Sequence, residues 1–408
     1  MSAFSKMKSL IHHHIWQRIP YRLRRRALFT ATSAMAPRIS TTTRPAQPII
    51  VAGALCSASG LGESARLCYE ALRAAGVPVL GVDISSPLMQ PLDADFAFAD
   101  GRNVAGPATL ILHVNSPLVP FALWRLGARL LRDKYVIGYW AWELPQVPDD
   151  WRHGIQFVHE IWVPSAFTAA AVRPIAGQRP VRIVPHPVAV RGGPAPVRAD
   201  GGAPFTVLTI FNAASSIARK NPAAVVAAFQ KAFGDDATAR LIIKASNLDV
   251  APSGREQLLA AIGSAANITL IEHTMSAAAM DQLFAESDVV ISLHRSEGFG
   301  LTIAEAMLRG IPAIATNWSG NVDFLTADTG RPVDFKMVPS DDPQGTYHYP
   351  EMQWADADVE DAARALRQLR DDPALAARLG EAGRAFARQH WTGEHYARIV
   401  LGHLGLEG

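Results

Sequence analysis

The chain has 408 residues, enough for two to three domains at ~150 residues each, and its 49% hydrophobic and 19% charged residues exclude a disordered polymer. Residues 1–48 hold nine of the 39 Lys and Arg side chains and no acid, which leaves 30 basic against 37 acidic side chains in the remainder. That acidic body excludes a uniformly basic nucleic-acid binder, two cysteines exclude a disulfide scaffold, and no apolar run approaches the ~20 residues that span a bilayer.

Residues 1–47 form a basic segment for which three interpretations stay open. It is a flexible extension, an interfacial segment whose cations meet anionic lipid, or an export signal. Pro20 would interrupt a long interfacial helix, and the apolar stretch after Arg26 is short and interrupted by Thr30 and Thr32, unlike an export signal. We expect a flexible segment and a cytoplasmic protein, with peripheral attachment to the inner face of the membrane through residues 1–48 as the alternative.

From residue 48 to residue 190, short apolar runs alternate with helical stretches. Continuous apolar strands separated by helices are typical of a parallel, doubly wound sheet. The expected strands cover residues 48–55, 77–82, 110–114, 135–140 and 161–163, and the expected helices cover residues 63–75, 121–131, 150–158 and 166–175. The sequence therefore predicts a Rossmann-like first domain over residues 48–190.

Residues 191–204 are dense in Gly and Pro and indicate a linker, after which the alternating pattern restarts. The expected strands are 205–211, 239–245, 268–272, 289–293 and 312–316, and the helices are 221–233, 254–265, 276–286, 302–309, 356–370, 373–389 and 391–403. We expect a second Rossmann-like domain over residues 205–385 and a C-terminal helix, residues 386–408, that returns to the first. Two such α/β domains face each other across a cleft, and ligands bind at the carboxyl edges of the sheets.

The segment SLHRSEGFGLTIAEAM, residues 292–307, combines a strand end, a glycine loop and a helix start. Gly298 and Gly300 let backbone N–H groups approach an anion, and the helix N-terminus adds unpaired donors. Glu297 and Glu305 would repel a phosphate, so we expect them to accept hydrogen bonds from hydroxyl groups. A nucleotide sugar offers both diphosphate and hydroxyls. The alternative is a solvated loop acid and an acid that benefits from the helix dipole.

Arg219 and Lys220 follow the first strand of the second domain and precede a helix opened by Asn221 and Pro222. Two fixed cations at a sheet edge can neutralise a diphosphate leaving group without a metal. An ordinary surface pair is the alternative. Lys244, at the end of the next strand, is a weaker candidate for the same cluster.

In the first domain, CSASGLGESAR, residues 56–66, forms a strand–glycine loop–helix turn. Gly60 and Gly62 allow close backbone approach, but Ala65 replaces the third glycine of a dinucleotide fingerprint. By itself the motif is more typical of an ordinary turn than of a binding loop. We expect no metal site, because no His-x-x-x-His pair occurs and the Asp pairs at 149–150 and 341–342 are typical of a helix start and a turn.

Together these motifs resemble the retaining family 4 glycosyltransferases of GT-B fold, and the stretch 294–324 resembles bacterial members that act in surface-polysaccharide assembly. YWAWELPQVPDDW at 139–151, VPSAF at 163–167 and VPHPV at 184–188 resemble the same subgroup. The resemblance covers roughly residues 49–390 and leaves the basic N-terminus unexplained.

The resemblance implies roles for the donor side of the site. Arg219 and Lys220 would hold the donor diphosphate, Glu297 would contact the transferred sugar, and Glu305 would contact the ribose hydroxyls. His273, in the segment 271–273, would lie beside the base. The remaining donor-binding candidates are the glycines and the backbone of the two loops: Gly60, Gly62, Gly298, Phe299, Gly300, Leu301 and Thr302.

One departure from the family pattern lies after the strand at 135–139, where many members carry a histidine near the reacting sugar. Here the sequence reads Trp140-Ala141-Trp142-Glu143. Our hypothesis is that Glu143 takes over part of that role, by binding the acceptor or steadying a cationic sugar; a structural acid capping the helix near Asp150 is the alternative. The acceptor candidates are His113, Asn115, Trp140 and Trp142.

The expected reaction is transfer of a hexose from a nucleoside diphosphate sugar to a saccharide or lipid-linked saccharide, with retained anomeric configuration and no cofactor or metal. By resemblance to polysaccharide mannosyltransferases, GDP-mannose is the first expectation for the donor and UDP-glucose the second. The alternatives are another GT-B enzyme, such as a phosphorylase or a sugar-nucleotide epimerase, and a non-catalytic carbohydrate-binding relative. We expect no nucleic-acid partner.

Overall fold

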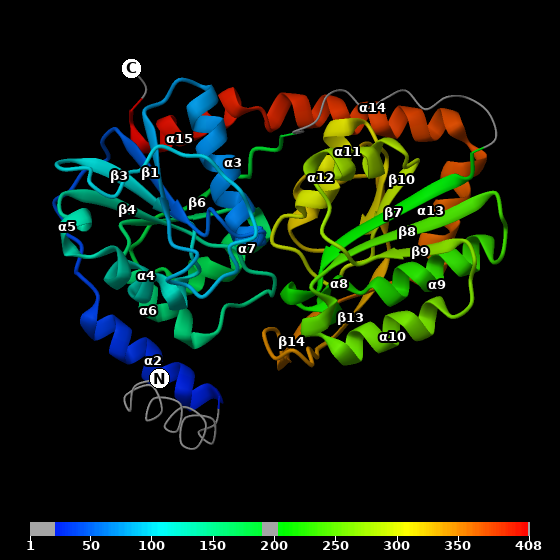
Figure 1. Cartoon of the computed structure of the whole chain (residues 1–408), viewed down its shortest axis with the longest axis horizontal. Coiled ribbons are helices and arrows are strands. Elements are labelled where there is room, and N and C mark those ends of the chain that lie inside the picture. Colours follow the sequence, from blue (N-terminus) through cyan, green and yellow to red (C-terminus); the bar gives the residue numbers. More distant parts are fainter. Residues whose placement is uncertain (1–20, 190–202, 407–408) are drawn as a thin grey trace.

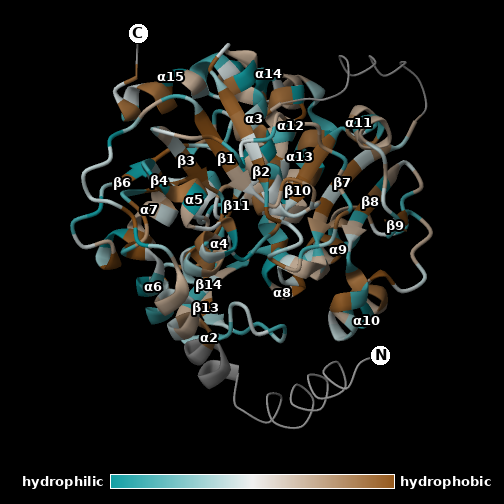
Figure 2. Cartoon of the chain, turned by 60° about the vertical axis from the view of Figure 1, so that its left-hand side comes forward, coloured by the Kyte–Doolittle hydropathy of each residue, from teal (hydrophilic) through white to brown (hydrophobic). Residues whose placement is uncertain are grey.

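Two lobes, each built on a six-stranded parallel sheet, make up the molecule (Figure 1). The computed structural model describes residues 21–189 and 203–406, with the side chains of residues 21–27 left out. Hydrophobic residues gather on the strands and on the helix faces between the layers, whereas the connecting loops are mostly hydrophilic (Figure 2). The expected α/β fold with two doubly wound domains is confirmed.

The first sheet has the strand order β2-β1-β3-β4-β5-β6, and all its pairs are parallel. Every residue of β1 and β3 is buried, because helices cover both faces of the sheet. Its strands are β1 Ile49–Gly53, β2 Val79–Asp83, β3 Ala108–Leu112, β4 Lys134–Tyr139, β5 Glu160–Val163 and β6 Val181–Ile183; its helices include α3 Gly60–Ala74, α4 Val119–Leu126, α5 Ala128–Leu131, α6 Arg152–Ile155 and α7 Ala166–Val172.

The second sheet has the order β12-β11-β10-β7-β8-β9 and is also parallel. Its strands are β7 Phe205–Asn212, β8 Ala239–Ser246, β9 Ile268–Ile271, β10 Val289–Ser292, β11 Ala313–Thr316 and β12 Arg331–Val333; its helices are α8 Ile217–Lys220, α9 Pro222–Phe233, α10 Pro252–Ile262, α11 Ala277–Ala285, α12 Leu301–Arg309 and α13 Val359–Asp371. Most of the expected linker, residues 191–204, lies outside the described residues.

The last two helices cross from the second lobe to the first, as expected. Helix α14 (Pro373–His390) packs along α12, and α15 (Gly393–Leu404) packs on α3 of the first lobe (Figure 1). Tyr396 and Val400 of α15 are buried in one apolar cluster with Leu72. The chain therefore completes the first lobe with its C-terminal residues.

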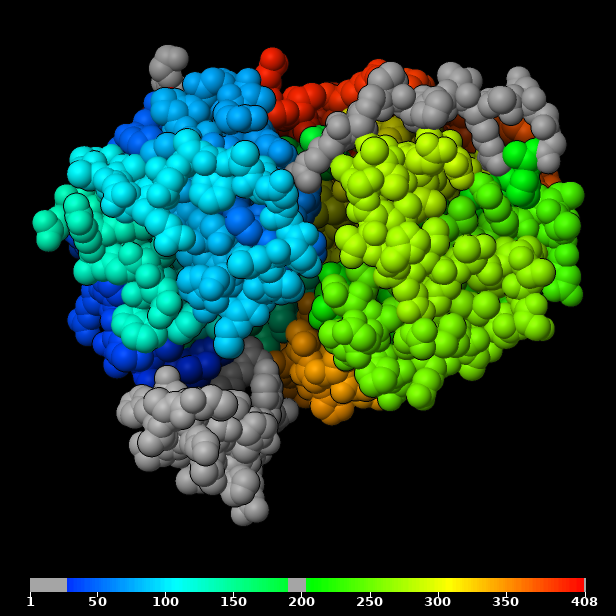
Figure 3. All heavy atoms as spheres, viewed as in Figure 1, coloured from blue at the N-terminus to red at the C-terminus, as the bar shows by residue number. Residues whose placement is uncertain are grey.

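An antiparallel hairpin that the sequence patterns did not predict lies at the boundary between the lobes (Figures 1 and 3). Its strands are β13 Phe335–Ser340 and β14 Tyr349–Ala357. Although the hairpin follows the second sheet in the chain, Tyr347 and Trp354 are buried in the apolar core of the first lobe. The expected helix at 356–370 consequently begins later, at Val359.

The expectation of a flexible basic segment is wrong for its second half. Residues 21–35 form helix α2 (Tyr21–Met35), which packs on α4 and α6, and Phe29 and Thr32 are buried there. Downstream, Ser40 and Thr43 contact the ring of His159 through hydrogen bonds of 2.9 and 2.8 Å. Residues 1–20 lie outside the described residues. Among the described helices, none combines the length and hydropathy needed to cross a membrane.

Two of the expected helices are shorter than their apolar patterns suggested. The helix expected at 121–131 is divided into α4 and α5 by Gly127, whose φ of +83° breaks the helix. The helix expected at 150–158 is reduced to a 3₁₀ turn at Asp149–Trp151 followed by α6. Gly154 of α6 packs so closely on Ser116 that an added Cβ would lie 2.4 Å from its carbonyl oxygen.

Candidate functional site

A short turn after β7 carries the two cations that the sequence singled out. Ser216, with a φ of +74°, is the N-cap of α8, and its side chain accepts a hydrogen bond from the Arg219 backbone N–H. The Arg219 side chain is buried and donates to the carbonyl oxygens of Ser215 (Nε, 3.1 Å) and Ser296 (Nη1, 2.7 Å). These bonds fix the guanidinium at the edge of the second sheet.

Glu297 contacts both cations. Arg219 Nη1 lies 3.2 Å from Glu297 Oε2, and Lys220 Nζ forms a hydrogen bond and ion pair with Glu297 Oε1. Burial alone would raise the pKa of the Glu297 carboxyl, but Lys220 and Arg219 outweigh burial and lower it to about 2. Burial lowers the pKa of Lys220, which Glu297 opposes. The three groups form a buried cluster in which one carboxylate faces two cations, so one positive charge is left over.

The glycine loop holds Glu297 in place and begins α12 at Leu301, close to the expected start. Ser319 Oγ accepts a hydrogen bond from the Glu297 N–H at 2.7 Å, and Gly300, with a φ of +101°, is the N-cap of α12. Such a conformation favours glycine. The Gly298 carbonyl accepts a 2.6 Å hydrogen bond from Ser165 of the first lobe. The loop therefore touches both lobes.

Glu143, which belongs to the first lobe, contacts the hairpin loop at the boundary between the two lobes. Its Oε2 accepts a 2.7 Å hydrogen bond from the hydroxyl of Tyr347, in the hairpin loop. The Arg219 guanidinium lies over the Tyr347 ring, 5.2 Å from its centroid. Burial raises the pKa of Tyr347 well above its usual value, and Glu143 adds to this. Tyr347 thus contacts both Glu143 and Arg219, a position that a helix cap near Asp150 would not require.

The acceptor candidates occupy less open positions than we expected. Trp140 is fully buried and Trp142 is 5% exposed; both rings pack on Trp151. Asn115 Oδ1 accepts a 2.9 Å hydrogen bond from the Ala141 N–H and ties two loops together. Both indoles are core residues of the first lobe, so they are not exposed for direct contact with an acceptor.

His113 belongs to a buried cluster with Ser64, Tyr139 and His186. Because Tyr139 donates its hydroxyl proton to the Val184 carbonyl at 2.7 Å, we assign the Nδ1 proton of His186 to the 3.1 Å bond with Tyr139. Ser64 then donates to His113 Nδ1 at 2.8 Å. Burial lowers the pKa of both histidines to about 3, so they are neutral. His113 Nε2 is buried without a hydrogen-bond partner among the described residues.

The two glycines of the first-domain loop differ in what surrounds them. A Cβ on Gly62 would lie 2.4 Å from the Ser57 carbonyl oxygen and 2.5 Å from that of Ala54, whereas a Cβ on Gly60 would meet no atom within 4 Å. Ser59 caps α3, so the helix begins before residue 63, where we expected it. Gly62 is required for packing at this turn.

We expect Gly62→Ala to lower the free energy of unfolding by ~1–3 kcal/mol, because backbone oxygens cannot move away from the new methyl group cheaply. Gly60→Ala, the matched control in the same turn, should be neutral or stabilising by up to ~1 kcal/mol. Urea unfolding of both variants measures the difference. Equal stabilities would show that the loop relaxes around the methyl group.

The other donor-side candidates differ in their exposure. Lys244 is buried and donates to the Ala245 carbonyl at 2.9 Å, without contact to Arg219 among its hydrogen bonds. His273 is exposed in the loop between β9 and α11. Glu305 is half-buried on the second turn of α12. The remaining candidates of the glycine loop are the buried Phe299 and the half-buried Leu301 and Thr302.

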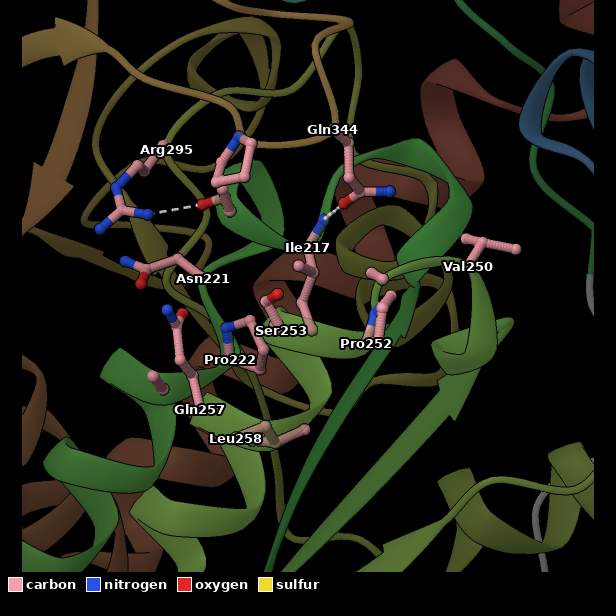
Figure 4. Close-up of a pocket in the computed structure, with 15 residues that line it drawn as sticks. Ile217, Asn221, Pro222, Val250, Pro252, Ser253, Gln257, Leu258, Arg295 and Gln344 are labelled. Atoms are coloured by element: carbon pink, nitrogen blue, oxygen red, sulfur yellow. Dashed lines mark hydrogen bonds between the residues drawn. The ribbon is translucent and has the colours of Figure 1, made fainter.

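A cavity of about 310 Å³ lies beside α8 (Figure 4). It is lined by residues of α8, α9 and α10 and closed by the hairpin loop through Gln344, whose side chain accepts a hydrogen bond from the Ile217 N–H at 2.7 Å. Neither Lys220 nor Glu297 lines this cavity. It is therefore separate from the charged cluster.

Sequence reasoning missed Tyr347 and its loop. The hydroxyl contact joins residues 204 positions apart in the chain, and the hairpin carries no nucleotide-binding signature. The Asp341–Asp342 pair was interpreted as a turn, which it is, but Asp342 also accepts a 2.8 Å hydrogen bond from Ser216. No group of three or more acidic, His or Cys side chains suited to a metal ion occurs within the described part of the chain.

Solved structures with the same fold support the architecture. Sucrose-phosphate synthase from Thermosynechococcus elongatus is 17% identical, with a TM-score of 0.64 over 88% of this chain and 98% of that chain. HepE of Anabaena in complex with UDP-glucose is 13% identical, with a TM-score of 0.59 over 88% and 99%. The pneumococcal O-GlcNAc transferase GtfA in complex with UDP and GlcNAc is 14% identical, with a TM-score of 0.53 over 74% and 57%.

This chain spans little more than half the length of GtfA and of Staphylococcus aureus TarM, at 57% and 55%. No curated protein matches it. The family model described as family 4 glycosyltransferase in conflict systems matches residues 165–399, more than half of the chain, including α8, the glycine loop and the hairpin. The chain therefore belongs to this family of glycosyltransferases.

Proposed function

We propose that the chain transfers a hexose from a nucleoside diphosphate sugar to a hydroxyl of a saccharide or lipid-linked saccharide, with retention of anomeric configuration. The observation that carries the proposal is the contact of Arg219 and Lys220 with Glu297, in a loop that touches both lobes. The arrangement brings two cations for a diphosphate and a carboxylate for sugar hydroxyls together at one edge of the second sheet.

In the proposed reaction, the bond between the anomeric carbon and the diphosphate oxygen breaks, and the acceptor oxygen forms a bond to the same face of that carbon. The departing diphosphate takes the acceptor's proton. Arg219, Lys220 and the α12 N–H groups stabilise the growing negative charge, and such preorganised groups commonly contribute several kcal/mol. No step requires a metal. Closure of the lobes would exclude water and limit hydrolysis of the donor.

The resemblance and the solved structures with the same fold support two donor candidates. GDP-mannose is the first candidate, and UDP-glucose, which is bound to HepE, is the second. A thermal-shift panel of GDP-mannose, UDP-glucose and UDP-GlcNAc tests the proposal, since a donor at 100 times its Kd stabilises the folded state by ~2.7 kcal/mol. The stabilising donor is then incubated with a saccharide acceptor, and release of the nucleoside diphosphate is measured.

Each outcome of that panel separates the proposal from its alternatives. Release that depends on the acceptor supports transfer. Epimerisation of the donor alone, or stabilisation without turnover, would replace transfer with an epimerase or a binding role. No stabilisation by any nucleoside diphosphate sugar would contradict the proposal.

We further propose that the protein acts in polysaccharide biosynthesis in the cytoplasm, attached peripherally to anionic lipid through residues 1–48. The nine basic and no acidic side chains of this segment support the attachment, as does the position of α2 on the first lobe, which is the proposed acceptor lobe. Flotation with vesicles containing anionic lipid, compared with neutral vesicles, tests it. Equal binding to both would contradict an electrostatic anchor.

A further inference from the structure

The hairpin loop at residues 341–348 is attached to the turn that carries the cation pair. Gln344 Nε2 donates to the Ala213 carbonyl at 2.9 Å, and its Oε1 accepts from the Ile217 N–H (Figure 4). Asp342 accepts from Ser216 Oγ at 2.8 Å and from the Tyr347 N–H at 3.0 Å. The loop and the α8 turn therefore form one hydrogen-bonded unit of the second lobe.

Tyr347 extends from this unit to the first lobe. Its ring lies between the Arg219 guanidinium, 5.2 Å away, and the Trp142 ring, 5.4 Å away, and its hydroxyl donates to Glu143 at 2.7 Å. The side chain is 6% exposed. Burial and these three contacts hold the hydroxyl in one orientation, so the Glu143 carboxylate is held as well.

Restraint of Glu143 has a consequence for the neighbouring cations. Glu143 is near enough to Arg219 and Lys220 to interact electrostatically with both, yet it forms no ion pair with either among the described contacts. Glu297 already occupies both cations. A second carboxylate that turned toward them would compete with an incoming diphosphate.

We propose that Tyr347 is a positioning residue that restrains Glu143 and keeps the second carboxylate away from the Arg219–Lys220 pair. The inference rests on the proposed function, in which that pair binds the donor diphosphate. Tyr347 acts through Glu143 and touches no reacting atom. The hairpin loop thus links diphosphate binding in the second lobe to a carboxylate of the first.

Binding of inorganic pyrophosphate, measured by calorimetry, tests the inference without depending on turnover. Tyr347→Phe removes only the hydroxyl and keeps the ring between Arg219 and Trp142. We expect this variant to bind pyrophosphate about tenfold more weakly, the size of effect typical of a lost hydrogen bond to a charged group. Adding Glu143→Gln should restore the affinity of the parent, because the freed side chain then carries no charge.

Glu143→Gln alone gives the gain in affinity that comes from removing a nearby negative charge. A larger gain from Glu143→Gln in the Tyr347→Phe background separates positioning from a merely structural role, which would give the same gain in both backgrounds. His348→Ala is the matched control: it lies in the same loop, is exposed and pairs with Asp341. It should bind pyrophosphate as the unaltered protein does. Unchanged binding in Tyr347→Phe, or a weakening that Glu143→Gln leaves in place, would overturn the inference while the proposed function stands. Failure of the unaltered protein to bind pyrophosphate would overturn both.

Discussion

Replacing Lys220 with alanine is expected to lower kcat at least ~100-fold, since the variant loses one of the two fixed cations proposed to stabilise the leaving diphosphate. The ammonium is held by Glu297 at the boundary of the lobes, so no solvent rearrangement is needed to orient it during the reaction. Stability should change much less. Glu297 keeps Arg219 as a partner at 3.2 Å, and we expect the thermal midpoint to fall by no more than ~3 °C.

Steady-state kinetics and a thermal melt of the same sample measure the two effects. Lys231→Ala is the matched control, because it removes the same atoms from a half-exposed surface pair with Glu360. It should leave both kcat and the midpoint nearly unchanged. Wild-type turnover in Lys220→Ala would remove the role assigned to this lysine.

The second large effect is expected for Glu297→Gln, which should bind a nucleoside diphosphate more tightly but turn over more slowly. The amide keeps the shape of the side chain but carries no charge, so a diphosphate at Arg219 and Lys220 no longer competes with a carboxylate for these cations. We expect the affinity for a nucleoside diphosphate to rise about tenfold. Turnover should fall at least ~100-fold, because the variant lacks the carboxylate that we propose accepts hydrogen bonds from the sugar hydroxyls.

Calorimetric titration with GDP and UDP gives the affinity, and product release gives kcat. Glu286→Gln is a suitable control, since it neutralises a surface carboxylate paired with Arg240. Neither quantity should change there. If Glu297→Gln bound the diphosphate no more tightly than the unaltered protein, competition between this carboxylate and the donor would be refuted.

Much of the fold could be predicted because the local patterns and the tertiary packing agree. The apolar runs at β1 and β3 are buried throughout, which only a sheet covered on both faces allows. The glycine loop ends at Leu301, within one residue of the expected helix start, because a positive φ at Gly300 fixes that boundary. Local chemistry decided both features.

The site was predictable in part for the same reason. Arg219, Lys220 and Glu297 follow the ends of adjacent parallel strands, β7 and β10, so topology alone brings them to one edge. Tyr347 could not be found that way, because its contact with Glu143 depends on how the two lobes meet. Trp140 and Trp142 were predicted to contact the acceptor, but both are buried. The sequence of an aromatic run is the same whether its side chains face a cleft or the core.

The position of α15 on α3 bears on any attempt to dissect the enzyme. A fragment that stops at the end of the first sheet would lack Tyr396 and Val400 of α15. Leu72 and its apolar neighbours, which pack with these two residues, would then face water. Exposed surface of this kind promotes aggregation. The first lobe can therefore not be cut out at a single peptide bond, and a separate first lobe would have to carry the twelve residues of α15 grafted onto it.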